Sequence, residues 1–455
     1  MRGEQHLTIF LTGIFLVNTN SVKNKHVVVV GAGMAGLLAA ASLADIVGKV
    51  TIIEKDALPK TPEVRKGVPQ GAHVHTLLGY AVQAMENLIP GLMTDVYAAG
   101  AVKIRRNHDI SFHDAVGPTP IRDVGILTPS VTRPLLEHVT RQKVLALPNV
   151  HLRDATQLLE LETDGQRDVV GVRVETDGTS ESISADLVVE CSGRASKLTR
   201  WLPAHGYGEV PAQRIKILMG YTSGFFRLPG DIATRSKACL MLAVPPGNRA
   251  AYLTPVDGDL WLATMYGRGR DTAPRDADGF IAWARGLPHP IIHQILSRAE
   301  PVSDFKSYKI PFGIWNRYDQ MPGFPDGLLP MGEALASFNP MYGQGMSLAA
   351  GQALSLRDAL SSGLDSNLAM RYFDGCNTLN GVGWSVMETR DFAYDCTSGE
   401  RPPDLEDRWA AAKAIRQLAE VDPEVHALSV RVTHLLEPPT VLADPHIVER
   451  ASKFT

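Results

Sequence analysis

Cysteine is scarce in this sequence, and no two cysteines have the spacing of a metal site or a redox pair. The four cysteines, Cys191, Cys239, Cys376 and Cys396, are far apart in a chain of 455 residues. Zinc sites and disulfide frameworks need closely spaced cysteines, so neither is expected here. This usage favours a reducing, cytoplasmic location.

Charge of one sign is not in excess, because the formal net charge is only -4. Lys and Arg form no runs and no nucleic-acid motif, so we expect no nucleic-acid partner. A membrane-spanning run of about 20 apolar residues is missing as well. The nearest is Leu7 to Val17, which no signal-cleavage site follows. We interpret residues 1–24 as a dispensable extension, with a targeting segment or peripheral anchor as the alternative, and we expect no stable membrane insertion.

A glycine motif follows the first β-branched run of the chain. The run His26 to Val30 predicts a buried parallel strand, and Gly31, Gly33 and Gly36 then open an Ala/Leu-rich helix. This G-x-G-x-x-G spacing permits the turn, the approach of a pyrophosphate to the backbone, and close packing of helix on strand. Glu54 ends the next strand, where a carboxylate accepts both ribose hydroxyls. The acidic residue disfavours NADPH at this site and leaves FAD or NAD.

A second glycine-rich junction, far downstream, separates FAD from NAD. The stretch "GEALASFNPMYGQGMS" gives Gly332 and Glu333, a proline, and a glycine turn that opens another helix. Glu333 can hold a ribityl hydroxyl, and the helix amides can stabilise charge at the N1/O2 edge of a reduced flavin. The cofactor-binding residues predicted from the two junctions are Gly31, Gly33, Met34, Ala35, Gly36, Glu54, Lys55, Gly332, Glu333, Gly343, Gln344, Gly345 and Met346.

With both junctions, the chain resembles the p-hydroxybenzoate-hydroxylase-fold FAD-dependent monooxygenases between about residues 25 and 360. This resemblance implies a mixed α/β fold in which a Rossmann-like FAD-binding domain contains an inserted antiparallel-sheet substrate domain. Glu333 stands where the family usually has Asp, which keeps the acceptor oxygen. We expect an N-terminal extension at residues 1–24 and a helical C-terminal region at residues 366–455. The FAD-binding domain is expected in three segments, at residues 25–100, 126–200 and 305–365. The substrate domain is expected in two segments, at residues 101–125 and 201–304.

Three further stretches, "RKGVPQGAHVHTLL", "TRPLLEHV" and "ASFNPMYGQGMS", look most like bacterial epoxidases of polyether-precursor polyenes, and like squalene- and styrene-epoxidase-type enzymes. By that resemblance Arg65 and Arg133 would lie at the FAD pyrophosphate, where a bidentate guanidinium suits the charge. The other interpretation of each arginine is a surface salt bridge.

The resemblance implies a reaction in which reduced FAD and O2 form a C4a-hydroperoxide that transfers one oxygen atom to the substrate. The expected substrate is a lipophilic polyene or isoprenoid intermediate, and epoxidation of its alkene needs no base. An aromatic hydroxylase and a non-oxygenating FAD-dependent isoprenoid reductase remain as alternatives. The W-x-W-x-I-P motif of tryptophan halogenases is missing from the sequence.

The chain departs from the family after the strand that precedes Ser192. Aromatic hydroxylases of this fold carry an Asp-Gly pair that contacts both FAD and NADPH, whereas this chain has Ser192-Gly193. The difference weakens the case for direct reduction by NADPH. We therefore expect reducing equivalents from NAD(P)H, delivered either directly or by a separate flavin reductase.

Aromatic residues of the middle segment are candidates for the substrate wall. Tyr221, Phe225, Trp261 and Met265 lie on expected strands, where residues two apart share a face. Plain core packing is the competing interpretation for each of them. The backbone of Phe338 and Asn339, together with Pro340, precedes the flavin-edge turn and is expected to face the reaction site.

The H-x-H pair His73 and His75 raises the question of a metal site. We expect a helix from Gly71 to Leu88, and on a helix such a pair does not share a face. Because the sequence suggests no third ligand either, no metal is expected.

Overall fold

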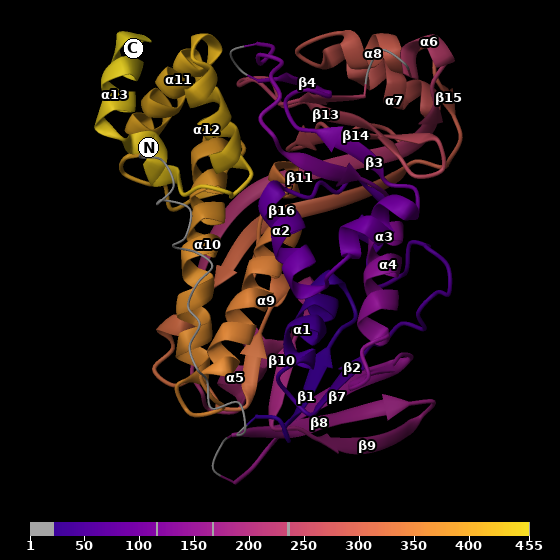
Figure 1. Cartoon of the computed structure of the whole chain (residues 1–455), viewed down its shortest axis with the longest axis vertical. Coiled ribbons are helices and arrows are strands. Elements are labelled where there is room, and N and C mark those ends of the chain that lie inside the picture. The colour runs from indigo at the N-terminus through magenta and orange to yellow at the C-terminus, as the bar shows by residue number, and fades with distance from the viewer. Residues whose placement is uncertain (1–21, 115–116, 166–167, 234–236, 455) are drawn as a thin grey trace, which may run out of the picture.

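The computed structural model describes residues 22–114, 117–165, 168–233 and 237–454. The expectation for residues 1–24 therefore falls almost wholly outside the described residues. The described chain forms a parallel sheet with helices, a larger mostly antiparallel sheet beside it, and a group of helices at the C-terminal end (Figure 1).

A five-stranded parallel sheet forms the first layer, in the order β17-β10-β1-β2-β6. Its strands come from distant parts of the sequence, so the domain is discontinuous. The central strand β1 is flanked on both sides and is nearly all apolar, as a doubly covered parallel strand requires. The strands are β1 (His26–Val30), β2 (Lys49–Ile53), β6 (Val150–Arg153), β10 (Leu187–Glu190) and β17 (Leu328–Pro330).

Helices cover this sheet, and α1 contacts both α9 and α4, while α2 contacts α9. Helix α4 starts where Thr132 caps it, with Pro134 in its first turn, where proline is tolerated. The helices of this part are α1 (Met34–Ala44), α2 (Gly79–Leu88), α3 (Leu92–Ala98), α4 (Arg133–Leu145), α5 (Leu198–Ala204) and α9 (Gly345–Ser361).

The described chain also forms two small sheets, apart from the five-stranded one. A three-stranded antiparallel sheet carries β7, β8 and β9, and a pair joins β3 to β5. Their bounds are β7 (Thr156–Thr163), β8 (Val169–Thr176), β9 (Thr179–Ser184), β3 (Val102–Arg105) and β5 (Leu127–Ser130).

A nine-stranded sheet forms the second lobe, with the long strand β11 pairing β14, β15, β16 and β19. All of its pairs are antiparallel except β4 with β12. Helices α7 (Ala277–Trp283) and α8 (Ile291–Leu296) enclose a second apolar core on one face of this sheet. The strands and one further helix are β4 (Ile110–His113), β11 (Ala212–Arg227), β12 (Ala238–Met241), β13 (Ala250–Val256), β14 (Leu260–Arg268), β15 (Glu300–Pro301), β16 (Lys306–Asn316), β18 (Ala336–Ser337), β19 (Ser398–Gly399) and α6 (Gly230–Ala233).

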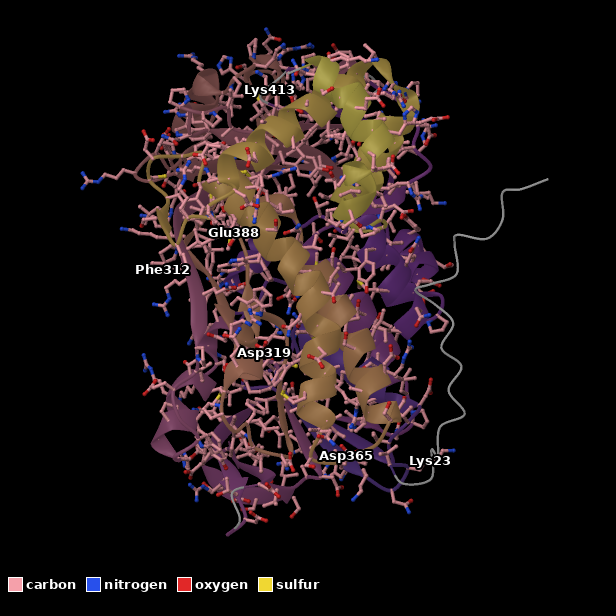
Figure 2. All side chains as sticks on the ribbon, turned by 90° about the vertical axis from the view of Figure 1, so that its left-hand side faces the viewer. Lys23, Phe312, Asp319, Asp365, Glu388 and Lys413 are labelled. Atoms are coloured by element: carbon pink, nitrogen blue, oxygen red, sulfur yellow. The ribbon has the colours of Figure 1, made fainter. Side chains whose placement is uncertain are left out.

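The C-terminal part is helical. The long helix α10 runs along the molecule from near Asp365 to beyond Glu388 (Figure 2), and it carries the chain to the remaining helices at the far end. No helix in the described part of the chain is both long and apolar enough to cross a membrane. The helices are α10 (Leu368–Asp391), α11 (Leu405–Val421), α12 (Pro423–Thr433) and α13 (Pro445–Ala451).

The expected helix from Gly71 to Leu88 is wrong in its first half. A short 3-10 turn covers Pro69–Ala72, and the α-helix begins only at Gly79. Between them the chain is not helical, and His73 instead has extended backbone angles. The His73 side chain hydrogen-bonds to Ser223 of the second lobe, and the Val74 amide donates to Thr264 of the same lobe. These tertiary contacts compete with the hydrogen bonds that a helix would make here.

Candidate cofactor and substrate site

A cavity of about 970 Å³ lies between the two lobes and reaches the C-terminal helices. The first glycine motif contributes Gly33 to its wall, and the second contributes Gly343. The antiparallel sheet contributes Tyr221, and α12 contributes Val430. Segments that are hundreds of residues apart in sequence therefore share one mostly apolar cavity.

The first motif shows why each glycine is needed. Gly31 has a φ of +102°, and a Cβ there would lie 2.8 Å from the carbonyl oxygen of Cys191. At Gly36 a Cβ would come within 1.8 Å of the Gly31 carbonyl oxygen, so any side chain would push α1 off the strand. Gly33 differs, because its nearest neighbour is Arg65 Nη2 at 3.8 Å. Gly33 therefore leaves an open approach to the start of α1, as an anion-binding turn requires.

Glu54 is the acid that ends β2, and it is buried on the cavity wall. Its Oε2 accepts a hydrogen bond from the Ala32 amide at 2.9 Å, and its Oε1 accepts one from the Asp56 amide at 3.0 Å. These two amides hold the carboxylate beside the glycine turn. A carboxylate can accept about four hydrogen bonds, so capacity remains for ribose hydroxyls.

Arg65 and Arg133 meet at one buried carboxylate, Glu137. Arg65 Nε lies 2.8 Å from Glu137 Oε1, and Arg133 Nη1 lies 2.7 Å from Glu137 Oε2. Burial alone would raise the pKa of Glu137, but Arg133 and Arg65 hold that pKa below its ordinary value. Arg65 Nη1 also lies 3.0 Å from Glu54 Oε2. Both arginines line the cavity as part of an internal charge network, so neither is a surface salt bridge.

The second motif faces the same cavity. Gly343 adopts a φ of +67° and packs against Thr76, and a Cβ at Gly345 would meet no atom within 4 Å. The start of α9 is therefore open toward the cavity, which Gly345 and Met346 line. Glu333 Oε1 accepts from Arg194 Nε at 3.0 Å, which joins the acid to the loop after β10. Gln344 is absent from the wall, and its Oε1 lies toward α10, near Gly383.

The remaining predicted cofactor residues also have definite positions. Met34, Ala35, Lys55 and Gly332 line the cavity, whereas Gly36 does not and serves helix packing. These residues fit FAD, because two open helix starts and two acids surround one continuous space. An NAD molecule would leave the second helix start without a ligand.

Phe338, Asn339 and Pro340 all line the cavity beside this loop, but Asn339 has a second role. Its Nδ2 donates to Asp391 Oδ1 at 2.9 Å, and its Oδ1 accepts from the Met341 amide at 3.1 Å. Asn339 is fully buried and therefore fixes the loop to the end of α10.

Asp391 gathers a buried polar network behind the loop. In addition to Asn339, the Tyr342 hydroxyl donates to Asp391 Oδ1 at 2.7 Å. Arg268 Nη2 also lies 2.7 Å from Asp391 Oδ1. The guanidinium of Arg268 stacks on Tyr394 at 3.9 Å from its ring centre. Arg268 comes from β14 and Asp391 from α10, so two distant elements hold the loop at residues 338–344, which is the predicted flavin-edge loop.

The register of β11 and β14 separates the four predicted substrate residues. Tyr221 lines the cavity and pairs across the sheet with Tyr266, which lines it too. Trp261 pairs with Phe226, and Met265 belongs with them to the core on the opposite face. Phe225 is not among the lining residues of the cavity. Only Tyr221 therefore enters the proposal for the substrate wall.

The cavity wall beside Tyr221 carries neutral polar groups. His73 Nδ1 lies 2.8 Å from Ser223 Oγ, and the His73 ring meets Tyr221 edge-on at 4.4 Å. Burial lowers the pKa of His73 to about 3 and, together with Arg133, lowers that of His75 to about 4. Burial raises the pKa of Tyr221 and of Tyr266. At neutral pH these four side chains are uncharged.

Sequence patterns gave no signal for several residues of the site. Asp391, Arg268 and Tyr308 belong to segments without a motif, and only the fold brings them to the cavity or its loop. The described residues contain no group of three or more His, Cys, Asp or Glu side chains that could hold a metal ion. The extended His73–His75 segment is instead bonded to Ser223 and to its own backbone.

A family model described as "FAD dependent oxidoreductase" matches residues 26–200. Protein Rv3254 of Mycobacterium tuberculosis is 32% identical over 447 residues, which cover 94% of this chain and 93% of that protein. The chain belongs to the FAD-dependent oxidoreductase family and is an enzyme of that class.

Monooxygenases are among the more distant relatives. Kynurenine 3-monooxygenase of Salinispora tropica is 25% identical, with 88% of this chain and 86% of that protein covered. Squalene epoxidase 1 of Arabidopsis thaliana is 24% identical over 73% of this chain and 59% of that protein. In fold, the flavin-dependent brominase Bmp2 aligns with a TM-score of 0.68 at 16% identity, covering 94% and 100% of the two chains. The fold is therefore that of the flavin-dependent monooxygenases and halogenases.

Proposed function

We propose that this enzyme inserts one oxygen atom from O2 into a lipophilic small molecule, and that it epoxidises an alkene of a polyene or isoprenoid intermediate. The observation that carries the proposal is the cavity itself. One mostly apolar space joins the two cofactor motifs to Tyr221, Phe338 and Pro340. A substrate there would lie directly beside the loop that holds the flavin edge.

The protonation states beside the loop favour epoxidation over phenol hydroxylation. Hydroxylation of a phenol benefits from a base that removes its proton, whereas an alkene needs none. With pKa values of about 3 and 4, His73 and His75 are weak bases. Glu333, the carboxylate whose charge acts on Tyr221 and Tyr308, is paired with Arg194.

Aromatic hydroxylation is the second candidate. A relative named kynurenine 3-monooxygenase covers 88% of this chain, and the cavity wall carries aromatic rings that could stack on an aromatic substrate. The product of the reaction distinguishes the two candidates.

The chain's own residues would bind the cofactor, orient the substrate and keep water away. Arg65, Arg133 and the open start of α1 would hold the pyrophosphate, and Glu54 would hold the ribose. Glu333 and the start of α9 would hold the flavin half. Reduced FAD, when bound, supplies activated oxygen, and the mostly apolar walls of the cavity would limit the access of water to it.

Electrons would come from NAD(P)H through a separate reductase. The loop after β10 carries Ser192-Gly193 in place of the family's Asp-Gly pair. Ser192 donates its amide, at 3.1 Å, and its hydroxyl to Glu190 Oε1 at the end of β10, so both of its donors already have a partner within the chain. NAD(P)H consumption by the holoenzyme, measured with and without an added flavin reductase, tests this proposal.

The decisive experiment combines labelled oxygen with rapid mixing. The reduced holoenzyme, mixed with O2, should show a transient absorbance that is neither reduced nor oxidised flavin. Mass spectrometry of products from farnesyl-type and polyene substrates under ¹⁸O2 should show one added labelled atom as an epoxide. Direct return to oxidised flavin with every candidate substrate, and no labelled product, would rule the proposal out.

A further inference from the structure

Arg106 is a buried arginine with no acidic partner among the described residues. It follows β3, is only 6% exposed and lines the cavity. Its Nε donates to Thr128 Oγ1 at 2.7 Å. Its Nη1 and Nη2 donate to the Tyr252 hydroxyl at 3.3 Å and the Leu77 carbonyl at 3.4 Å, which are long contacts.

The other buried arginines on this wall are neutralised. Arg65 and Arg133 both pair with Glu137. The neighbour Arg105, which is half-buried, pairs with Asp109 and Asp123. Burying an uncompensated cation is costly, so a buried guanidinium without a carboxylate indicates that its counter-ion comes from outside the chain.

The surroundings of Arg106 do not supply a negative charge. His434 lies close enough for Arg106, together with burial, to lower the pKa of the histidine to about 3. His75 and Tyr252 also line the cavity, and burial and Arg133 lower the pKa of His75 as well. The groups that accept hydrogen bonds from Arg106 are the Thr128 hydroxyl, the Tyr252 hydroxyl and the Leu77 carbonyl, and none of them is a carboxylate.

The position of Arg106 relates it to the reaction site. Its guanidinium bonds to the carbonyl of Leu77, and Leu77 follows Thr76, against which Gly343 of the flavin-edge loop packs. Tyr252, its other partner, belongs to β13 of the substrate-side sheet. Arg106 therefore lies on the substrate side of the loop, whereas Arg65 and Arg133 lie at the dinucleotide end.

We propose that Arg106, assisted by the Tyr252 hydroxyl, binds a carboxylate of the substrate, which is thus a lipophilic acid. The proposal rests on the proposed function and narrows its substrate class. Both Nη atoms make only long contacts, so they can turn toward a planar carboxylate in a bidentate pair. Anchoring the acid group at Arg106 would place the apolar chain of the substrate along the cavity.

Binding of matched probes to the oxidised holoenzyme tests the proposal without turnover. Farnesoic acid and its methyl ester share the same apolar chain, but the ester head group is uncharged and carries one added methyl group. Their affinities can be measured from the perturbation of flavin absorbance and by calorimetry. We expect the acid to bind at least about tenfold more tightly than the ester, the usual worth of a charge-assisted hydrogen bond.

Substitutions test whether Arg106 is the side chain that causes the preference for the acid over the ester. Arg106→Gln should abolish the preference for the acid while leaving ester binding within about twofold, and Arg106→Lys should restore part of it. Arg105→Gln changes the adjacent arginine, which does not line the cavity, and should leave both affinities unchanged. Circular dichroism and retained FAD show that each variant is folded.

Three outcomes would overturn the proposal. These are equal binding of acid and ester, binding of neither probe, and equal weakening of both probes in Arg106→Gln. A changed flavin reduction potential without any change in acid preference would instead make Arg106 a partner of the reduced flavin. These binding measurements involve no oxygen transfer. A negative result would therefore overturn the role of Arg106 without contradicting the proposed oxygenation, which the labelled-oxygen experiment tests separately.

Discussion

At the scale of single residues, the site depends on buried charges that compensate one another. Arg65 contacts Glu54, Asp56 and Glu137, and its Nη2 is the atom closest to the open side of Gly33. The same guanidinium thus neutralises the carboxylates and offers positive charge where a pyrophosphate would bind. The stretch around His73, which invites a metal interpretation from sequence, holds this arginine instead.

Arg65→Ala should therefore weaken FAD binding. Removing a charge-assisted contact costs about 1.5–3 kcal/mol, so we expect the Kd for FAD to rise at least about tenfold. The measurement is the loss of flavin absorbance on gel filtration, with Kd from fluorescence titration. Lys66→Ala, at the exposed neighbouring position, is the matched control. Loss of activity on treatment with EDTA, with FAD still bound, would contradict the metal-free interpretation.

At the scale of elements, Asp391 joins three segments at one point. The end of α10, strand β14 and the flavin-edge loop all meet at its carboxylate through Arg268, Asn339 and Tyr342. The loop position is therefore determined by the packing of helix against sheet. Sequence patterns predict the loop and the helix separately but carry no information on this connection.

Asp391→Ala should destabilise the enzyme and change its flavin. Removing one partner of a buried pair costs about 3–5 kcal/mol, because Arg268 is left buried without its counter-ion. Urea unfolding measures that loss, and a shift of the bound flavin's absorbance maxima reports on loop displacement. Asp395→Ala, at an exposed position just beyond the helix, should change neither quantity. An unaltered flavin spectrum in folded Asp391→Ala would show that the Asp391 network does not position the loop.

At the scale of the whole molecule, the C-terminal helices are part of the site. Helices α11 and α12 line the cavity, and Arg416 of α11 pairs with Asp114 of the segment after β4. His434, just after α12, accepts the Gly79 amide at Nδ1 with a distance of 3.0 Å. That contact joins the C-terminal helices to the start of α2.

This contact predicts a pH-dependent stability. Burial and Arg106 lower the pKa of folded His434 to about 3 from its ordinary value of 6.5. The unfolded state therefore binds the proton more readily, so His434's stabilising contribution is complete above pH 6.5 and declines as the pH falls toward 3. The slope contributed is at most about 1.4 kcal/mol per pH unit.

Urea unfolding of wild type and His434→Gln between pH 7 and pH 5 measures the effect. The variant should be less stable at pH 7 and should show a smaller loss of stability on acidification. His446→Gln, at an exposed position, serves as control and should retain the wild-type pH dependence. Identical slopes in wild type and His434→Gln would refute the assignment.

The sequence by itself determined the cofactor half of this enzyme. Strand β1, the turn at Gly31 to Gly36 and Glu54 form a continuous unit, so their spacing reflects the local geometry of a Rossmann-type dinucleotide site. The second junction at Gly332 to Met346 is equally local. A helix start and a glycine turn are recognisable within about a dozen residues because the hydrogen bonds involved join near neighbours.

Only the tertiary structure decided the substrate half. Whether Tyr221 or Trp261 faces the cavity depends on the register and orientation of β11 and β14, which no single strand encodes. The segment at His73 is extended because it bonds to Ser223 and not to its own next turn. Arg106 and Asp391 acquire their roles from partners contributed by separate elements, because burial and charge compensation are properties of the assembled fold.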